Sequence, residues 1–279
     1  MKLVLAGVPL GNPGDASARL ISAIKSASII AAEDSRRFQR LCQDLNVATD
    51  AKVLSFFEGN EDERTEQLLK ELQNGAEVLV VTDAGMPTVS DPGFKLVRAV
   101  VEAKIDIEVI PGPSAVTTAL ALSGLPTDRF CFEGFVPRTQ GARDKFFDNL
   151  KFESRTIVFF EAPHRLLETL DSAIAILGDD RKAALCREMT KTYEETVRGT
   201  LSEIQSWANS KEILGEITMV IDGASEGAKE ISQQAIIDAV RKLEEVGMER
   251  KEAIAAVSKE LDLPKREVFD AMVAAKNLQ

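Results

Sequence analysis

Three short segments rich in glycine and proline contain the residues of this sequence that are best suited to hold a ligand. They are residues 8–15 (VPLGNPGD), 82–93 (TDAGMPTVSDPG) and 111–115 (PGPSA). Glycine lets a backbone approach a ligand closely and adopt positive φ, whereas proline fixes the shape of a loop in advance. One such segment alone is most simply explained as a tight turn. Three of them, each directly after an expected strand, favour a ligand site at the carboxyl ends of those strands.

The residue types in these segments indicate which ligand would fit. None of the segments contains the GxGxxG pattern of dinucleotide sites or a phosphate-binding loop that ends in Gly-Lys-Ser/Thr. They also contain no lysine or arginine that could neutralise a triphosphate. S-adenosylmethionine has few negative charges and a cationic sulfonium that nearby acids tolerate, so it fits better. The candidate cofactor-binding residues here are Pro9, Gly11, Asn12, Asp83, Ala84, Gly85, Pro87, Ser90, Asp91, Pro111, Gly112, Ser114 and Ala115.

Short apolar strands alternate with amphipathic helices through the first 110 residues, and these elements must position the three segments. Strands are expected at 3–6, 28–32, 77–81 and 107–110. Helices are expected at 16–26, 64–73 and 93–102. Strands that alternate with helices imply crossover connections and a largely parallel sheet.

The second half continues with different elements. A helix at 114–122 is followed by expected strands at 130–135, 156–161, 183–187 and 216–221, and by helices at 143–150, 165–177 and 201–209. We place a boundary near residues 111–114 and expect a cleft between the two lobes, where ligand pockets are frequent. The expected domains are 1–112, 113–226 and 230–279.

The third domain reads as three short amphipathic helices at 232–246, 249–261 and 265–276. Ser232 and Pro264 suit helix starts, and Gly247 marks a turn. These helices could form a helix-turn-helix-like module, but an appendage that only packs is the stronger alternative because acids accompany its basic residues.

Composition excludes several classes of protein. The 279 residues include 44% hydrophobic and 28% charged residues, which is typical of a soluble globular protein. The sequence has no apolar stretch long enough for a secretory signal or a membrane span, so we expect a cytoplasmic location. His164 is the single histidine, which excludes a zinc enzyme with several imidazole ligands. The net charge of −11 argues against broad binding to nucleic acid but allows a local basic patch.

Eight sequence blocks resemble one known family. They are 8–15, 31–36 (AAEDSR), 82–87 with 90–93, 111–115, 132–137 (FEGFVP), 161–165 (EAPHR), 187–191 with 193–195 (REMTK and YEE) and 215–216 (GE). Together they resemble the bacterial 16S rRNA cytidine 2′-O-ribose methyltransferases of the tetrapyrrole methylase-like superfamily, from residue 5 to about residue 223. Each block alone is a weak signal, whereas eight blocks in order are specific.

The resemblance implies a fold, a reaction and partners. The fold would be α/β, with two α/β lobes, S-adenosylmethionine in the interlobe cleft and a small C-terminal helical appendage. The activity would be methylation of a cytidine ribose 2′-hydroxyl in the 16S rRNA of the 30S ribosomal subunit. A homodimer that needs neither a metal nor a membrane is expected. The resemblance adds Glu161, Pro163 and Glu216 to the candidate cofactor-binding residues.

A ribose 2′-hydroxyl is a poor nucleophile until a base removes its proton, so the reaction needs a proton acceptor. The candidate catalytic residues are Glu33, Glu188 and Lys191. Lys191 could be the base if burial lowers its pKa, or it could contact a phosphate. Glu33 follows a strand and could face the cofactor or the nucleotide, while Asp34 could simply cap a helix.

Basic residues near the blocks are the candidates for RNA contact. Arginine suits phosphate because its planar guanidinium donates two parallel hydrogen bonds. The candidate RNA-binding residues are Arg36, Arg37, Arg138, Arg143, His164, Arg165 and Arg187. For any single one, a solvated surface charge is the simpler alternative.

Two other functions compete with this interpretation. One is a methyltransferase of the same superfamily that acts on a tetrapyrrole carbon or a diphthamide precursor, against which the blocks at 33–36 and 161–165 argue. The other is a non-catalytic RNA- or ribosome-binding module that has kept the fold. The intact glycine segments argue against loss of the cofactor site.

Overall fold

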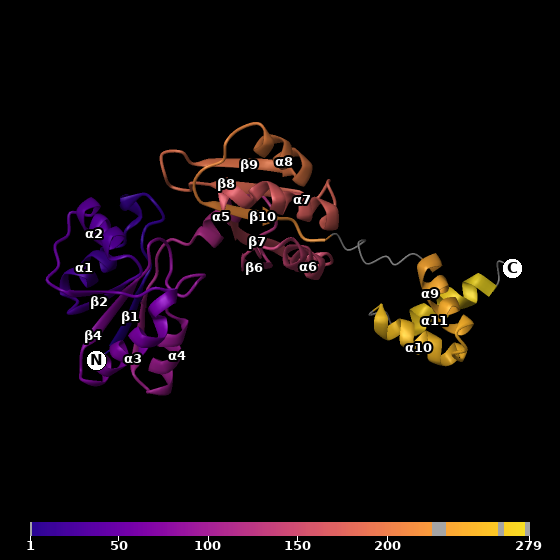
Figure 1. Ribbon diagram of the computed structural model, residues 1–279, viewed down its shortest axis with the longest axis horizontal. Helices are drawn as coiled ribbons and strands as arrows, with labels where there is room; N and C mark the ends of the chain where they lie inside the picture. Colours follow the sequence, from indigo (N-terminus) through magenta and orange to yellow (C-terminus); the bar gives the residue numbers. More distant parts are fainter. Residues whose placement is uncertain (1, 225–232, 262–264, 277–279) are drawn as a thin grey trace. The chain divides into compact units, whose positions relative to one another are not determined.

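The computed structural model describes residues 2–224, 233–261 and 265–276 of the chain. The chain divides into two compact units, Met1–Gly223 and Ala224–Gln279. The first unit contains two five-stranded sheets, and the second contains helices (Figure 1).

The first sheet is entirely parallel, with strand order β3-β2-β4-β1-β5. Its strands are β1 (Lys2–Ala6), β2 (Ile29–Ala32), β3 (Lys52–Ser55), β4 (Glu77–Val81) and β5 (Asp106–Ile110). Its helices are α1 (Ala18–Ser26), α2 (Ser35–Asp44), α3 (Glu61–Gln73) and α4 (Phe94–Glu102). The central strands are apolar except for the first residues of β1 and β4, Lys2 and Glu77, because helices cover both faces of a parallel sheet.

Side chains of β1 alternate between two separate cores on the two faces of this sheet. Val4 and Ala6 pack against α1 and α2, whereas Leu3 and Leu5 pack against α3 and α4. Figure 1 shows the two helix pairs on opposite sides of the strands. This packing holds the carboxyl ends of β1 and β4 rigidly at one edge of the sheet.

The second sheet is mixed, with strand order β6-β7-β10-β8-β9; β6 and β7 pair in parallel and the other pairs are antiparallel. Its strands are β6 (Phe130–Phe135), β7 (Thr156–Glu161), β8 (Lys182–Arg187), β9 (Glu195–Thr200) and β10 (Ile217–Ile221). Its helices are α5 (Ala115–Ser123), α6 (Gln140–Leu150), α7 (Leu166–Leu177) and α8 (Leu201–Asn209). The core formed with α5 is separate from the one formed with α6, α7 and α8.

The predicted fold class, two α/β lobes with a helical appendage, is confirmed. The expected boundary at residues 112 and 113 falls between β5 and α5, where the chain passes from one sheet to the other. Both sheets nevertheless belong to one compact unit.

The sequence analysis missed α2, β3 and β9. Phe38 of α2 is buried, and Leu41, Cys42 and Leu45 pack against the same core at helical spacing. The apolar stripe of this helix was therefore present in the sequence, and the sequence analysis did not use it. β3 and β9 are edge strands, and none of their residues is fully buried. Edge strands expose more of their surface and so carry a weaker apolar pattern than central ones.

The second unit consists of α9 (Gln233–Glu245), α10 (Arg250–Glu260) and α11 (Lys265–Lys276). Its core is formed by apolar residues of all three helices, among them Ile236, Val240, Val257, Val268 and Met272. Gly247 has φ +91° in the turn after α9, as expected for a helix end. The expected helix starts at Ser232 and Pro264 lie outside the described residues.

No helix in the described part of the chain is long and apolar enough to cross a bilayer.

Candidate functional site

The three glycine- and proline-rich segments follow β1, β4 and β5, which are neighbours in the first sheet. Their carboxyl ends therefore meet at one edge. The Val8 amide donates to the Gly85 carbonyl over 2.8 Å, and the Gly85 amide donates back to Val8 over 3.1 Å. The Gly7 amide donates to the Ile110 carbonyl over 2.9 Å. These hydrogen bonds hold the three segments together as one framework.

Gly7 and Gly112 allow two of these segments to touch. A Cβ atom on Gly112 would lie 2.7 Å from the carbonyl carbon of Gly7, and one on Gly7 would lie 2.7 Å from the Gly112 Cα. A Cβ atom makes ordinary van der Waals contact at about 3.4 Å or more, so any side chain at either position would force the two backbones apart. The close approach explains glycine at these two positions.

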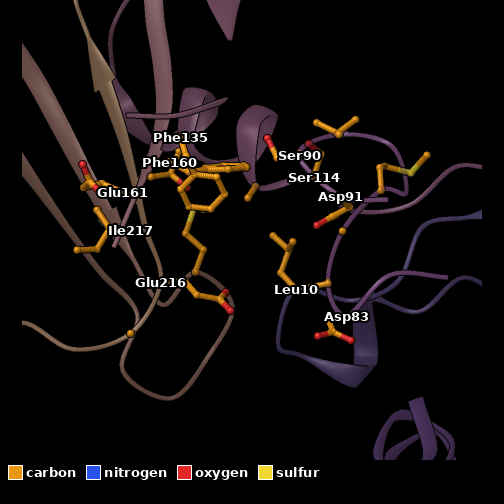
Figure 2. A pocket seen from close by; sticks show the side chains of 18 of the residues that line it. Leu10, Asp83, Ser90, Asp91, Ser114, Phe135, Phe160, Glu161, Glu216 and Ile217 are labelled. Carbon is orange, nitrogen blue, oxygen red and sulfur yellow. The ribbon is translucent and has the colours of Figure 1, made fainter. Parts of the chain in front are cut away.

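A cavity of about 390 Å³ opens where these segments face the second sheet (Figure 2). Ligand pockets usually have volumes of about 300–1,000 Å³. The predicted cofactor residues that line it are Asp83, Ala84, Gly85, Ser90, Asp91, Ser114, Ala115, Glu161, Pro163 and Glu216. The remaining predicted cofactor residues, which lie outside its lining, are Pro9, Gly11, Asn12, Pro87, Pro111 and Gly112. Of these, Gly112 shapes the loops.

The walls of the cavity combine acidic and aromatic side chains. Figure 2 shows Leu10, Asp83 and Asp91 from the first sheet's loops facing Phe135 and Phe160 from the second sheet. The two phenylalanine rings meet edge to face with centroids 5.4 Å apart. Acidic residues line both sides of the cavity, because Glu161 and Glu216 lie on the side of the phenylalanines. A cavity that combines carboxylates with aromatic rings suits an organic ligand that carries positive charge.

The sequence analysis did not name several residues of the lining as site residues: Leu10, Met86, Val89, Phe135, Phe160, Ala162, Met189, Gly215, Ile217 and Thr218. Most are apolar, and an apolar side chain in a site looks like a core residue in sequence. Their position inside or beside the quoted blocks was the only available signal.

Asp91 has the clearest electrostatic perturbation in the cavity. Burial raises its pKa to about 7, and the negative charges of Glu33, Asp83 and Glu216 add to this rise, although a hydrogen bond with Thr82 opposes it. Burial and Glu33 also raise the pKa of Asp83. A cation placed among these carboxyls would relieve their repulsion.

Glu33 is held in place on the side of the cavity that the first sheet forms. Its Oε2 accepts hydrogen bonds from the Thr82 hydroxyl at 2.6 Å and from the Asp83 amide at 3.1 Å. Asp83 in turn accepts from the Asp34 amide at 3.1 Å and pairs with Arg37 at 3.3 Å. The ends of β2 and β4 are thereby linked, and the Glu33 carboxylate is positioned in the cavity wall.

Backbone strain is concentrated in two loops that contribute to the cavity. Thr88 and Ser90 have φ values of +74° and +62°, and Glu188 and Thr190 have +51° and +65°. Residues other than glycine rarely adopt such values, which cluster at functional sites because the surrounding structure must impose them.

Lys191 does not have the lowered pKa that a general base would need. Burial would lower its pKa, but Glu188 and Glu216 outweigh that effect and raise it. Its ammonium lies 2.9 Å from the Glu188 carboxylate and 3.1 Å from the Glu216 carboxylate. Lys191 was a candidate base only if burial lowered its pKa, and the two acids raise that pKa instead. Lys191 and Glu188 form a fixed ion pair beside the cavity, and neither lines it.

The Lys191 stem also connects the two lobes. It packs against Gly11, and the neighbouring Thr190 hydroxyl accepts from the Asn12 amide at 3.2 Å. The loop after β8 is thus fastened to the loop after β1. Gly11 and Asn12, which were expected to bind the cofactor, contact this loop and lie outside the cavity lining.

Glu161 is almost completely buried, at 2% exposure. It accepts hydrogen bonds from the Ala162 amide and the Thr169 hydroxyl and pairs with Arg165 at 2.5 Å. Arg165 also donates to the Val136 carbonyl. These contacts give Glu161 and Arg165 a role in shaping the cavity wall.

The seven predicted RNA-contacting residues separate by exposure. Arg36, Arg37, Arg138 and His164 are exposed. Arg187 is mostly covered and pairs with Glu195 at 3.1 Å. The prediction that Arg143 contacts RNA is wrong. Arg143 is only 5% exposed, and its guanidinium contacts Ser172, Glu168 and the Arg138 carbonyl. Its charge is used inside the lobe and is not presented to a phosphate.

Among the described residues, no group of three or more His, Cys, Asp or Glu side chains has the arrangement of a metal site.

Similarity to known proteins agrees with this geometry. Residues 2–205 match the family model of Tetrapyrrole (Corrin/Porphyrin) Methylases. In solved structures, a uroporphyrin-III C-methyltransferase from Thermus thermophilus complexed with S-adenosylhomocysteine aligns with a TM-score of 0.54 and 18% identity, over 79% of this chain and 96% of that one. A diphthine synthase aligns with a TM-score of 0.59 and 17% identity, over 80% of this chain and 90% of that one.

More similar relatives share one name, ribosomal RNA small subunit methyltransferase I. The relative from Mycobacterium tuberculosis (strain H37Rv) is 45% identical over 99% of this chain and 95% of its own length. That from Bacillus subtilis (strain 168) is 38% identical over 96% and 93%. That from Thermotoga maritima is 43% identical over 80% of this chain and 98% of its own length. The chain therefore belongs to the tetrapyrrole methylases and, within them, to the ribosomal RNA small subunit methyltransferase I family.

Proposed function

We propose that this protein transfers the methyl group of S-adenosylmethionine to the ribose 2′-hydroxyl of a cytidine in the 16S rRNA of the small ribosomal subunit. The observation that carries the proposal is the cavity between the two sheets, which is lined by acidic residues from both sheets and by the aromatic rings of Phe135 and Phe160. Family membership at 38–45% identity over nearly the whole chain supports the rRNA substrate.

The cavity residues fit this cofactor. The volume of about 390 Å³ accommodates a nucleoside with an amino-acid arm. Backbone groups of Ala84, Gly85 and Ala115 would hold its polar ends, and Asp83 and Asp91 would lie near its cationic centre. When bound, S-adenosylmethionine supplies an electrophilic methyl group on a sulfonium.

The chain's own residues would perform three tasks in the reaction. Glu33, fixed by Thr82, would accept the proton that leaves the ribose 2′-hydroxyl as the oxygen forms its bond to the methyl carbon. The bond from that carbon to sulfur breaks, and its electron pair stays on the sulfur. Phe135 and Phe160 would exclude water from the reacting groups. Arg36, Arg37, Arg138 and His164 would contact the RNA.

Two features bear on the competing functions. The solved methylases of small molecules align at only 17–18% identity, while the relatives named for rRNA reach 45%. A non-catalytic module would not need a strained, acidic cavity of this kind.

We also propose that the protein is a homodimer in the cytoplasm. Apolar side chains exposed on α4 and β5, namely Phe94, Val101 and Val109, support a second copy as the partner.

The deciding experiment is transfer of a tritiated methyl group to 30S subunits taken from cells that lack this protein. We expect one modified ribose, mapped to a cytidine, and a weaker signal with a tetrapyrrole acceptor. Glu33→Gln keeps an oxygen for Thr82 but removes the base, so we expect transfer to fall at least about 100-fold while cofactor binding persists. Binding of the cofactor without transfer to 30S would exclude the proposed acceptor. No cofactor binding by calorimetry would favour the non-catalytic module.

A further inference from the structure

A second cavity of about 390 Å³ lies beside the first at the carboxyl ends of β2, β3 and β4. We call it the stacking pocket. Its lining residues are Glu33, Asp34, Ser35, Arg36, Ser55, Phe57 and Asp83. Glu33 and Asp83 line both cavities, so a ligand in the stacking pocket would reach the wall where the proposed methyl transfer occurs.

Phe57 is the one aromatic side chain in this lining, and its side chain is not part of a core. It is 46% exposed, whereas the preceding Phe56 is 1% exposed and packs in the core between the first sheet and the helices α3 and α4. The Phe57 ring lies against Gly59, where a Cβ atom would be only 2.8 Å from Phe57 Cε2. The backbone thus supports part of the ring and leaves nearly half of the residue open to a ligand.

Hydrogen bonds hold the backbone around Phe57 in position. Its amide donates to the Asn60 side-chain oxygen at 2.9 Å. The Asn60 amide group donates to the Ser55 carbonyl at 3.1 Å, and Arg64 donates to the same carbonyl at 3.2 Å. An exposed aromatic ring on a fixed backbone is suited to stack on a planar ligand because little motion is lost on binding.

The charged groups of the stacking pocket suit a nucleotide. Oδ1 of Asp34 caps α2, accepting from the Arg36 amide at 2.7 Å and the Arg37 amide at 3.4 Å. Its Oδ2 lies 3.6 Å from the Arg36 guanidinium, which is 90% exposed and can move. Oδ2 can therefore accept a hydrogen bond from a ligand's amino group, and Arg36 can bind a phosphate.

We propose that the stacking pocket binds the base of the acceptor nucleotide, with the base stacked on Phe57. The exocyclic amino group of the base donates to Asp34, and Arg36 contacts the adjoining phosphate. This inference rests on the proposed function. It selects a base with an amino group, such as cytosine, over uracil, which has a carbonyl oxygen at the same place.

The position of Glu33 links this pocket to the chemistry. With the base on Phe57, the ribose of the same nucleotide lies toward the shared wall, where Glu33 meets the first cavity. An acceptor nucleotide must leave the RNA stack to enter such a pocket, and aromatic stacking compensates for that loss. Phe57 is thus a specificity residue for the acceptor nucleotide.

The first test changes the aromatic ring. We expect Phe57→Ala to raise the KM for 30S subunits about 10- to 100-fold, the usual effect of losing one stacked base, with unchanged cofactor affinity. Phe57→Trp should restore most of the loss. Phe152→Ala removes another exposed phenylalanine, which lines neither cavity, and should change nothing. Equal kinetics for Phe57→Ala and wild type would overturn the proposal, as would equal losses in the Ala and Trp variants.

The second test addresses the amino group. Asp34→Asn keeps the helix cap but presents an amide donor in place of a carboxylate oxygen. Wild type should methylate 30S subunits with cytidine at the acceptor position at least about 10-fold better than subunits with uridine there, and Asp34→Asn should remove or reverse this preference. An unchanged preference in the variant would contradict the role of Asp34.

A third measurement separates this inference from the proposed reaction. NMR titration with cytidine 5′-monophosphate and uridine 5′-monophosphate requires no methyl transfer. We expect cytidine 5′-monophosphate to bind wild type more tightly than the uridine nucleotide, and to bind Phe57→Ala more weakly than wild type. If 30S subunits were not methylated but this pattern held, the proposed function would fail and the stacking pocket would stand. Equal binding to wild type and Phe57→Ala would reject the stacking pocket alone.

Discussion

Asp91 lies in the cavity with Glu33, Asp83 and Glu216, and its environment disfavours a negative charge. Burial and the neighbouring acids raise its pKa from the ordinary 3.8 to about 7. The folded protein therefore holds a proton on Asp91 over a pH range in which the unfolded chain has released it. The stability that the folded protein gains from binding this proton is complete below about pH 4 and is lost as the pH rises through 7.

Asp91→Asn should therefore stabilise the protein in a pH-dependent way. Asparagine is neutral at every pH, so the variant should unfold with a free energy about 2 kcal/mol higher than wild type at pH 8, a value discounted for partial exposure. The difference should vanish near pH 4. Urea unfolding at both pH values measures it, with the exposed Asp128→Asn as a control. A difference that does not depend on pH would show that Asp91 is ionised throughout.

A substitution at Lys191 tests whether the reaction uses a neutral amine as the proton acceptor. Glu188 and Glu216 keep its pKa raised, so its charge should matter for holding the loop after β8 and not for proton transfer. We expect Lys191→Met, which retains most of the stem packed on Gly11, to weaken cofactor binding about 3- to 10-fold, comparable to losing a partly buried ion pair. The pH profile of transfer should keep its shape. Abolished transfer with normal cofactor affinity would instead give Lys191 a chemical role.

At the scale of elements, the site depends on the contact between the loops after β1 and β5. Gly112→Ala would place a methyl group within 2.8 Å of three backbone atoms of Gly7, and backbone cannot move aside as a flexible side chain can. We expect the free energy of unfolding to fall by about 2–4 kcal/mol, together with cofactor affinity.

Gly141→Ala is the matched control, because α6 leaves open space around that glycine. It should be neutral or stabilise by up to about 1 kcal/mol. Urea unfolding compares the two variants. Equal stabilities would show that the Gly7–Gly112 contact does not constrain the loops.

Sequence patterns located most elements because each buried strand or amphipathic helix has its own periodicity. β4, β6, β7 and α8 were predicted with the bounds that the structure has. α2 was missed although Phe38, Leu41, Cys42 and Leu45 recur at helical spacing and pack against one core. Element patterns are local, and they weaken wherever an element lies at an edge.

At the scale of the whole molecule, the two units raise the question of what the C-terminal helices contribute. Each unit has its own apolar core, and the residues that line the cavity in the described part of the chain belong to the first unit. The relative from Thermotoga maritima covers 80% of this chain with 98% of its own length, so a shorter chain occurs in the family.

We therefore expect a chain that ends after Ala224 to fold and to bind S-adenosylmethionine within about twofold of the full chain, as separate cores predict. Calorimetry measures this, and transfer to 30S subunits shows whether the helices aid contact with the ribosome. Loss of cofactor binding in the shorter chain would mean that the second unit supports the cavity.

Local sequence determined the segments that would surround a ligand, because glycine, proline and acidic residues directly after strands are visible without knowing the fold. It also determined the family through eight ordered blocks. Only the tertiary structure decided which charges are free to act: Arg143 is buried against Ser172 and Glu168 of α7, and Lys191 is held protonated by Glu216 as well as by Glu188 of its own loop. Likewise Phe57 and Phe135 look like core residues in sequence. Only the fold places Phe57 at the carboxyl ends of the first sheet's strands and Phe135 at the wall between the two sheets. Exposure and pKa depend on neighbours in space, and a linear pattern does not contain those neighbours.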